Sequence, residues 1–188
     1  MLIGLDKYKT LLMDKIPDIS TSIIISGNDG IGKFSLVLDV VKNLVNNEEN
    51  IHVIKPEDGK SQISVEQIRD IFPIINIKPF NDKRHMIIID EADKLNDVSF
   101  NILLKRLEEP KSSELFILVT SRMDAIADTI KSRCLNVNIA LDYSEMQSYV
   151  SKIEDKDIRY VLNKMGFSYV ISYVNSDTIK SRYADAKK

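Results

Sequence analysis

The stretch SGNDGIGKFS, residues 26–35, decides how the rest of the sequence is interpreted. It fits the phosphate-binding pattern G-x-x-x-x-G-K-[ST] through Gly27, Gly32 and Lys33. Such a loop works because successive backbone N–H groups converge on one point at the positive end of a helix dipole. These two glycines and Gly30 allow the backbone conformations that the loop needs, and Lys33 can reach the terminal phosphates. The sequence therefore predicts a phosphate cradle between a strand and a helix.

The residue after the lysine departs from the pattern. A serine or threonine at this position binds Mg²⁺ through its hydroxyl, and Phe34 has no such ligand. Ser35 lies one residue further, about 100° around the helix, so we expect it to point elsewhere. We predict weak or no nucleotide binding, and less hydrolysis still. The plainer interpretation is that Phe34 is a packed residue in a loop retained only as structure.

The sequence around this loop alternates apolar, β-branched runs with segments of helical spacing. Strands are expected at 22–27, 51–56, 85–90, 115–121 and 134–139, and helices at 3–15, from 32, from 65, at 98–109 and at 125–133. Ser64 and Gln67 have the spacing of a capping box at the start of the third helix. Continuous apolar strands between helices indicate an α/β fold with a parallel sheet covered on both faces.

The strand pattern stops near residue 141. Residues 143–173 have the spacing of two or three short helices, and residues 180–188 form a polar tail. We therefore expect an α/β domain at 1–140 and a small helical appendage at 141–188.

Composition limits the classes of function. The chain has 188 residues and a net charge of −2, so no overall field favours nucleic acid or an anionic membrane. Cys134, His52 and His85 are too few for a four-ligand zinc site, and one cysteine cannot form an intrachain disulfide. No apolar run approaches the roughly 20 residues of a membrane span, and the N-terminus lacks a basic leader. We expect a cytoplasmic protein.

Two acids follow the third expected strand. In MIIIDEADK, residues 86–94, Asp90 and Glu91 come directly after a buried strand, where α/β sheets bind ligands. Asp90 would hold Mg²⁺ through water, and Glu91 would orient or deprotonate an attacking water. An acidic helix start alone accounts for Asp93. The letters DEAD also occur in RNA helicases, but these need a second domain that the chain is too short to hold.

The segments GNDGIGK, IIIDEADKL, FNILLKRLEEP, FILVTS and IKSRC follow one another in a specific order. In this order the chain resembles the AAA+ clamp-loader ATPases, and among them the delta-prime subunits of bacterial DNA polymerase III. The resemblance covers residues 1–140 well and the start of a helical lid more loosely. It implies a P-loop domain with a five-stranded parallel sheet of order 5-1-4-3-2 and a small C-terminal helical lid. It also implies a ring-like pentamer of clamp-loader subunits that loads a sliding clamp onto primed DNA.

The resemblance assigns roles to individual residues. The arginine of the SRC motif, Arg133, would reach into a neighbouring subunit's ATP site as an arginine finger, and such fingers raise rates by roughly 10³–10⁵. The plainer interpretation of Arg133 is a cation that favours a helix C-terminus. Thr120 and Ser121 end the fourth strand, where the family places its γ-phosphate sensor. Arg122 follows where a polar amide is common, which argues against normal sensor chemistry.

Three departures from the family follow. The segment 41–54 lacks the cysteines of the zinc module that members often carry there, so no zinc is expected. The lid segment 163–176 has no clear arginine to return to the γ-phosphate. The C-terminal collar domain of relatives is expected to be absent.

The leading hypothesis is thus a clamp-loader subunit that donates Arg133 and hydrolyses little or no ATP, with Mg²⁺–ATP possible only at a degenerate site. The alternatives are an active AAA+ ATPase that tolerates Phe34 and an unrelated P-loop kinase or nucleic-acid-directed switch. Lys105 and Arg106 could meet DNA phosphates, although a solvated helix face explains them as well.

Overall fold

The structure is a computed structural model that describes residues 4–140. In chain order its elements are α1 (Asp6–Lys15), β1 (Ser22–Gly27), α2 (Lys33–Leu44), η1 (Glu48–Asn50), β2 (Ile51–Ile54), α3 (Val65–Ile75), β3 (His85–Ile89), η2 (Ala92–Lys94), α4 (Asp97–Glu108), β4 (Glu114–Thr120), η3 (Met123–Ala125), α5 (Asp128–Lys131) and β5 (Cys134–Ile139).

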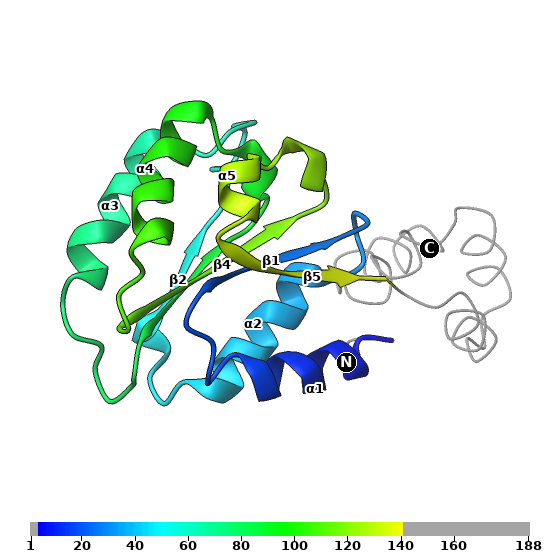
Figure 1. Cartoon of the computed structure of the whole chain (residues 1–188), viewed down its shortest axis with the longest axis vertical. Coiled ribbons are helices and arrows are strands. Elements are labelled where there is room, and N and C mark those ends of the chain that lie inside the picture. Colours follow the sequence, from blue (N-terminus) through cyan, green and yellow to red (C-terminus); the bar gives the residue numbers. More distant parts are fainter. Residues whose placement is uncertain (1–3, 141–188) are drawn as a thin grey trace, which may run out of the picture.

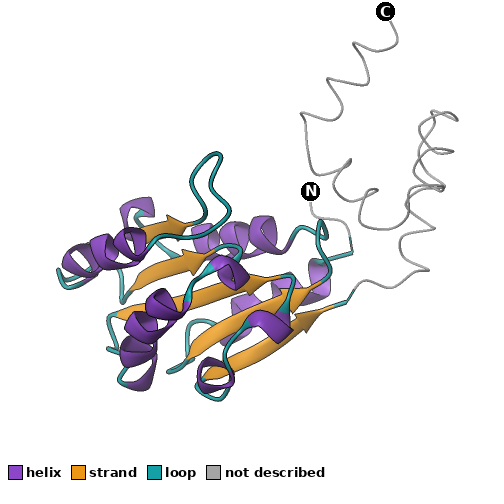
Figure 2. Cartoon of the chain, turned by 90° about the horizontal axis from the view of Figure 1, so that it is seen from above, coloured by secondary structure: helices purple, strands orange, loops and turns teal. Residues whose placement is uncertain are grey.

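The strands form one sheet in the order β2-β3-β4-β1-β5, and each neighbouring pair is parallel. Counted from the other edge, this is the order 5-1-4-3-2 that the resemblance implies, so the expected fold class is confirmed. Helices lie on both faces of the sheet (Figures 1 and 2). Parallel strands require this arrangement, because each connection must cross back over the sheet before the next strand begins.

Each strand contributes to two separate cores, because successive side chains of a strand point to opposite faces. In β1, Ile23 and Ile25 pack with the residues of α1 and α2, whereas Ile24 packs with those of α3, α4 and α5. All three are fully buried. Burial on both faces is the reason why the strands are continuous apolar runs rather than alternating ones.

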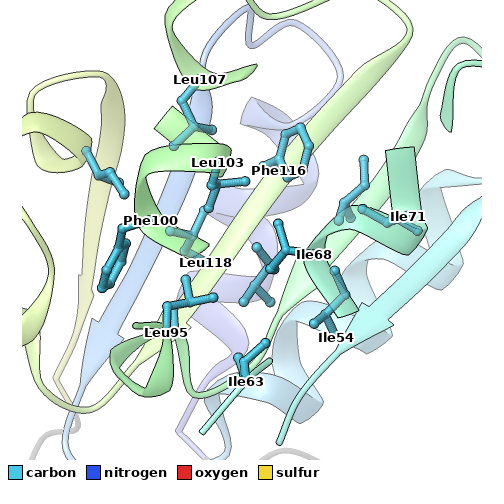
Figure 3. Close-up of a cluster of buried hydrophobic side chains, with 14 of the residues drawn as sticks. Ile54, Ile63, Ile68, Ile71, Leu95, Phe100, Leu103, Leu107, Phe116 and Leu118 are labelled. Carbon is cyan, nitrogen blue, oxygen red and sulfur yellow. The ribbon is translucent and has the colours of Figure 1, made fainter. Parts of the chain in front are cut away.

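Figure 3 shows the second of these cores. Ile68 of α3 and Leu103 of α4 gather there with Phe116 and Leu118 of β4, and all four side chains are nearly or fully buried. This packing fixes α3 and α4 against the middle of the sheet. The loops at the carboxyl ends of the strands, where ligands are expected, are thereby held at one edge.

Most element boundaries lie within one residue of the predicted ones, but the first helix begins at Asp6 rather than at residue 3, and two other elements also differ more. The second strand ends at Ile54 rather than at residue 56, and the helix expected at 125–133 is split into the short turn η3 and the single turn α5. The predicted capping box is present: Ser64 Oγ accepts from the N–H of Gln67 at 3.2 Å, and Gln67 Oε1 accepts from the N–H of Ser64 at 3.0 Å. The helical appendage expected at 141–188 lies outside the described residues.

Two histidines pair at the amino ends of β2 and β3. His85 Nε2 lies 2.9 Å from the carbonyl oxygen of Ile77, and a carbonyl only accepts, so Nε2 carries the proton. The unprotonated Nδ1 of His85 then accepts from Nε2 of His52 at 3.0 Å. Burial, helped by the neighbouring His85, lowers the pKa of His52. Burial therefore disfavours the charged form of His52 in the folded protein.

We predict that this pair makes the fold sensitive to mild acid. Below the ordinary histidine pKa of 6.5, the unfolded chain binds a proton at His52 that the folded chain resists. The free energy of unfolding should therefore fall as the pH drops from 7.5 to 5.5. Urea unfolding at the two pH values measures this fall.

The variant His52→Gln is the control, because its amide N–H can donate to the same acceptor without titrating. Glu114 pairs in register with His85, and burial raises its pKa, but this carboxyl is common to both proteins and its effect cancels in the comparison. The wild type should lose more stability on acidification than the variant. Equal losses would show that the pair has no such effect.

Candidate nucleotide-binding site

The loop between β1 and α2 has the backbone conformation that its glycines allow. Gly27 has a φ of 152°, and a Cβ there would lie against the carbonyl oxygen of Ile139 and 2.8 Å from Cδ1 of Ile31. Gly32 has a φ of 86° and immediately precedes the first residue of α2. The close approach of β1 to β5 and the turn into the helix thus both require glycine.

The ammonium group of Lys33 is fully bonded within the chain. Its Nζ donates to the carbonyl oxygens of Gly27 at 3.0 Å and Asn28 at 2.8 Å, and to the hydroxyl of Ser121 at 2.8 Å. An ammonium group has three N–H donors, so these three bonds use all of them. The side chain is buried, and burial lowers the pKa of Lys33, while Asp29 raises it. Lys33 therefore ties the loop to the end of β4.

The acids after β3 have different surroundings. Asp90 is partly buried, and this burial raises its pKa, partly offset by a hydrogen bond from the N–H of Glu91 at 3.0 Å. Glu91 is exposed and has a left-handed φ of 53°. Asp93 accepts a hydrogen bond from the hydroxyl of the buried Thr120 at 2.7 Å, and so links η2 to β4.

These residues surround a cavity of about 320 Å³ at the carboxyl edge of the sheet. Of the residues predicted from the sequence, the cavity is lined by Gly30, Gly32, Lys33, Asp90, Glu91 and Thr120. Gly27 is the last residue of β1 and is not among the lining residues. Sequence reasoning missed Asp29, which also lines the cavity and whose Oδ1 is bonded to the N–H of Gly30 at 2.9 Å. Its place within the glycine-rich loop was the only available signal.

The two residues after Lys33 both border this cavity. Phe34 is half-buried and packs against the core beneath α1 and α2, and it is also among the residues that line the cavity. Ser35, expected to point elsewhere, is exposed and contributes to the cavity wall. The first turn of a helix surrounds its own N-terminal end, so residues pointing in different directions can border a ligand there.

The donor set fits a phosphate better than it fits magnesium. The glycine-rich turn, the N-terminus of α2 and the Lys33 amine suit an anion. Phe34 offers no oxygen where the metal ligand is expected, although Asp90, Ser35 and Thr120 are among the oxygen-bearing residues that line the cavity. Within residues 4–140, no cluster of three or more His, Cys, Asp or Glu side chains is close enough to hold a metal ion.

Arg133 lies away from this cavity. It directly precedes Cys134, which pairs with Ser22 at the amino end of β1, whereas the cavity lies beyond Gly27 at the other end. Strand β5 has 6 residues, so the two places are separated by about 20 Å of strand. The structure thus does not bring Arg133 together with the other predicted site residues.

The Arg133 guanidinium is only partly exposed. Its Nη2 lies 2.9 Å from Oε1 of Glu108 at the end of α4, and its Nη1 donates to the carbonyl oxygen of Thr129 at 2.7 Å. The side chain keeps 36% of its surface exposed.

The fold and the loop together define a P-loop α/β protein of the AAA+ class. The family described as "DNA polymerase III, delta subunit" matches residues 42–142. The chain belongs to this family.

Two curated relatives carry the names of DNA polymerase III subunits. The chain is 37% identical over 107 residues to "DNA polymerase III subunit gamma" of Buchnera aphidicola subsp. Acyrthosiphon pisum, with 57% of this chain and 28% of the relative covered. It is 31% identical over 83 residues to "DNA polymerase III subunit delta'" of Pseudomonas aeruginosa, with 44% and 25% covered. The aligned part spans only about a quarter of these curated relatives.

A solved structure supports the fold. A DNA polymerase III gamma subunit-related protein from Thermotoga maritima is similar, with a TM-score of 0.65 and 24% identity over 81% of this chain and 51% of that chain. The longest described helices, α2 and α4, have 12 residues each, and no helix of the described part could cross a membrane.

We predict that Gly27→Ala will unfold the loop or destabilise the whole fold. The added methyl group would collide with the main chain of Ile139, which cannot move without opening the β1–β5 pair. Gly59→Ala is the matched control, because Gly59 also has a positive φ, of 78°, but has open space around its Cβ. It should cost only about 1–2 kcal/mol of conformational strain.

Thermal or urea unfolding of both variants measures the difference. A Gly27→Ala variant that is as stable as Gly59→Ala would show that β1 and β5 do not approach each other as closely as the structure indicates.

Proposed function

We propose that this chain is a clamp-loader subunit of a DNA polymerase III assembly, similar to delta-prime. In this role it takes part in ATP-driven loading of the sliding clamp onto primed DNA. It donates Arg133 to the ATP site of a neighbouring subunit and hydrolyses little or no ATP itself. The proposed partners are the other subunits of a ring pentamer, with the clamp and the primer-template DNA contacted through the complex, in the cytoplasm.

The position of Arg133 carries this proposal. The residue is at the amino edge of the sheet, about 20 Å of strand from the cavity of its own chain. A guanidinium at that edge cannot serve the home phosphate loop, but it can face the cavity of another subunit. There it would neutralise charge that develops on a transferred phosphoryl group.

The contact with Glu108 holds Arg133 in place before such a partner arrives. Both side chains are partly exposed, at 36% and 43%, so the ion pair is worth about 1 kcal/mol or less. A triphosphate carries more charge than one carboxylate and would compete well for the guanidinium. The pair is therefore compatible with a finger that is held ready.

The home site supports the second part of the proposal. The three N–H donors of Lys33 Nζ already bond to Gly27, Asn28 and Ser121. A phosphate must therefore displace at least one of these hydrogen bonds. Phe34 packs against the core and supplies no metal ligand. Asp90 and Glu91 stay as proposed magnesium-holding and water-orienting residues of a degenerate site.

An active ATPase is the second candidate, and one observation favours it. Ser35 lines the same cavity as Asp90, and its hydroxyl could take over the role of the missing ligand. Under either proposal, residues 1–140 act as the P-loop domain and residues 141–188 as its helical lid.

Direct contact of α4 with DNA is not part of the proposal. Arg106 is engaged by Asn76 Oδ1 at 2.7 Å and by Glu114 Oε1 at 3.5 Å, and it lies over the ring of Phe72. Lys105 is exposed on the same helix, as expected of a solvated face.

We predict that Arg133→Ala will slow ATP turnover of the assembly reconstituted with its partner subunits by about 10³-fold or more, because the transition state loses a charge. The matched control is Lys131→Ala, which removes another cation of the same short segment. It should leave turnover unchanged. Circular dichroism checks that both variants fold. An unchanged rate with Arg133→Ala would refute the finger.

We predict that the isolated wild-type chain will not bind Mg²⁺–ATP with micromolar affinity in calorimetry. Phe34→Thr should tighten binding at least about tenfold, because it restores an oxygen ligand for the metal. Ser35→Ala should leave the wild-type result unchanged. Micromolar affinity with turnover in the wild type, lost in Ser35→Ala, would instead support the active ATPase.

A further inference from the structure

A second cavity lies at the amino edge of the sheet, away from the phosphate loop. Its volume is about 730 Å³, more than twice that of the cavity beside Lys33. It is formed by the ends of α1 and α2, the start of β3 and the loop of residues 78–84. Apolar side chains of Leu44, Val45 and Met86 contribute to its wall. Nothing in the proposed nucleotide chemistry uses this hollow.

The loop at its rim is held by hydrogen bonds from two polar side chains, the buried Asn50 and the partly exposed Asp82. Asn50 is only 2% exposed and makes two hydrogen bonds to the main chain of Phe80. Its Oδ1 accepts from the Phe80 N–H at 3.2 Å, and its Nδ2 donates to the Phe80 carbonyl at 2.8 Å. Asp82 accepts from the backbone N–H groups of Asn46 at 2.8 Å and Asn47 at 3.1 Å. These bonds connect the loop to the segment between α2 and β2.

Phe80, the residue that Asn50 holds through its backbone, has an apolar side chain that is largely exposed to solvent. Phe80 is 65% exposed although its backbone is fixed, and Ile77 nearby is 70% exposed. An aromatic side chain has few rotatable bonds, so on a fixed backbone it loses little conformational entropy when it is covered, and such residues often dominate protein interfaces. The rim of the cavity is thus prepared for an apolar contact.

The charges around the rim define what can bind. Lys78 and Lys83 are exposed, and neither has an ion-pair partner among residues 4–140. The guanidinium of Arg84 donates to the carbonyl of Ile19 at 2.7 Å and supports the floor. The acid in the lining, Asp82, is satisfied by N–H donors. An occupant therefore meets two free cations and an apolar hollow.

We propose that this cavity, with Phe80 at its rim, binds a segment of a partner protein in which one or two apolar side chains are flanked by Asp or Glu. The apolar side chain fills the hollow against Phe80, and the flanking carboxylates pair with Lys78 and Lys83. A second copy of this chain fits poorly, because the same basic rims would face each other. Nucleic acid would leave the walls around Leu44 and Met86 without an apolar partner.

The test uses the full chain and a pool of fluorescent ten-residue peptides, each with one or two aromatic or aliphatic residues between Asp and Glu. A matched pool carries Lys in place of the acids. The acidic pool should bind by fluorescence polarisation, and the basic pool should not. Phe80→Ala should weaken binding of the best acidic peptide at least about tenfold. The double variant Lys78→Glu, Lys83→Glu should abolish it.

Val98→Ala is the control variant, because Val98 is 54% exposed on α4 and does not line this cavity. It should bind the peptide as the wild type does, and the melting temperatures should show that every variant folds. Four results would each overturn the proposal: no binding from the acidic pool, equal binding from the basic pool, an unchanged affinity with Phe80→Ala, or sedimentation showing that the rim is covered by a second copy. None of them bears on Arg133, whose test is independent.

Discussion

The parallel direction of the strands is the constraint on which the rest of the molecule depends. Because every strand runs the same way, the segments that follow the strands meet at one edge of the sheet and those that precede them meet at the other. The phosphate loop, Asp90 and Thr120 meet at the carboxyl edge, where they line one cavity. Arg133 and the hollow beside Phe80 lie at the amino edge. One topology thus places the cavity beside the phosphate loop at one edge and Arg133 with the hollow beside Phe80 at the other.

The ammonium group of Lys33 has all its hydrogen-bond partners within its own chain. A buried ammonium group needs partners, since desolvation otherwise disfavours its charge. Here two carbonyl oxygens of the loop and the hydroxyl of Ser121 supply them, so the loop stays closed against the end of β4. The same contacts that stabilise the loop also oppose the arrival of a nucleotide. In a subunit that acts on its neighbour, such a loop would have a structural role and hold the end of β1 to the end of β4.

Much of the fold could be predicted from the sequence. The apolar runs at β1, β3 and β4 are unambiguous because both faces of these strands are buried, and the capping box at Ser64 marks a helix start by local chemistry. Boundaries near α5 were less certain, since a single helical turn has little periodicity to detect. Ser35 also borders the cavity, which the helical angle between neighbouring residues does not predict, because the first turn of a helix surrounds its own N-terminal end.

By itself, the sequence determined the order of the strands and helices, the glycines of the loop and the loss of the hydroxyl at Phe34. These depend on residue type and short-range spacing. Only the tertiary structure decided three hydrogen bonds. Thr120 donates to Asp93, Lys33 donates to Ser121, and Asn50 donates to the backbone carbonyl of the exposed Phe80. Those contacts join residues 27 to 88 positions apart, and their formation depends on how the chain crosses the sheet, which local sequence patterns do not record.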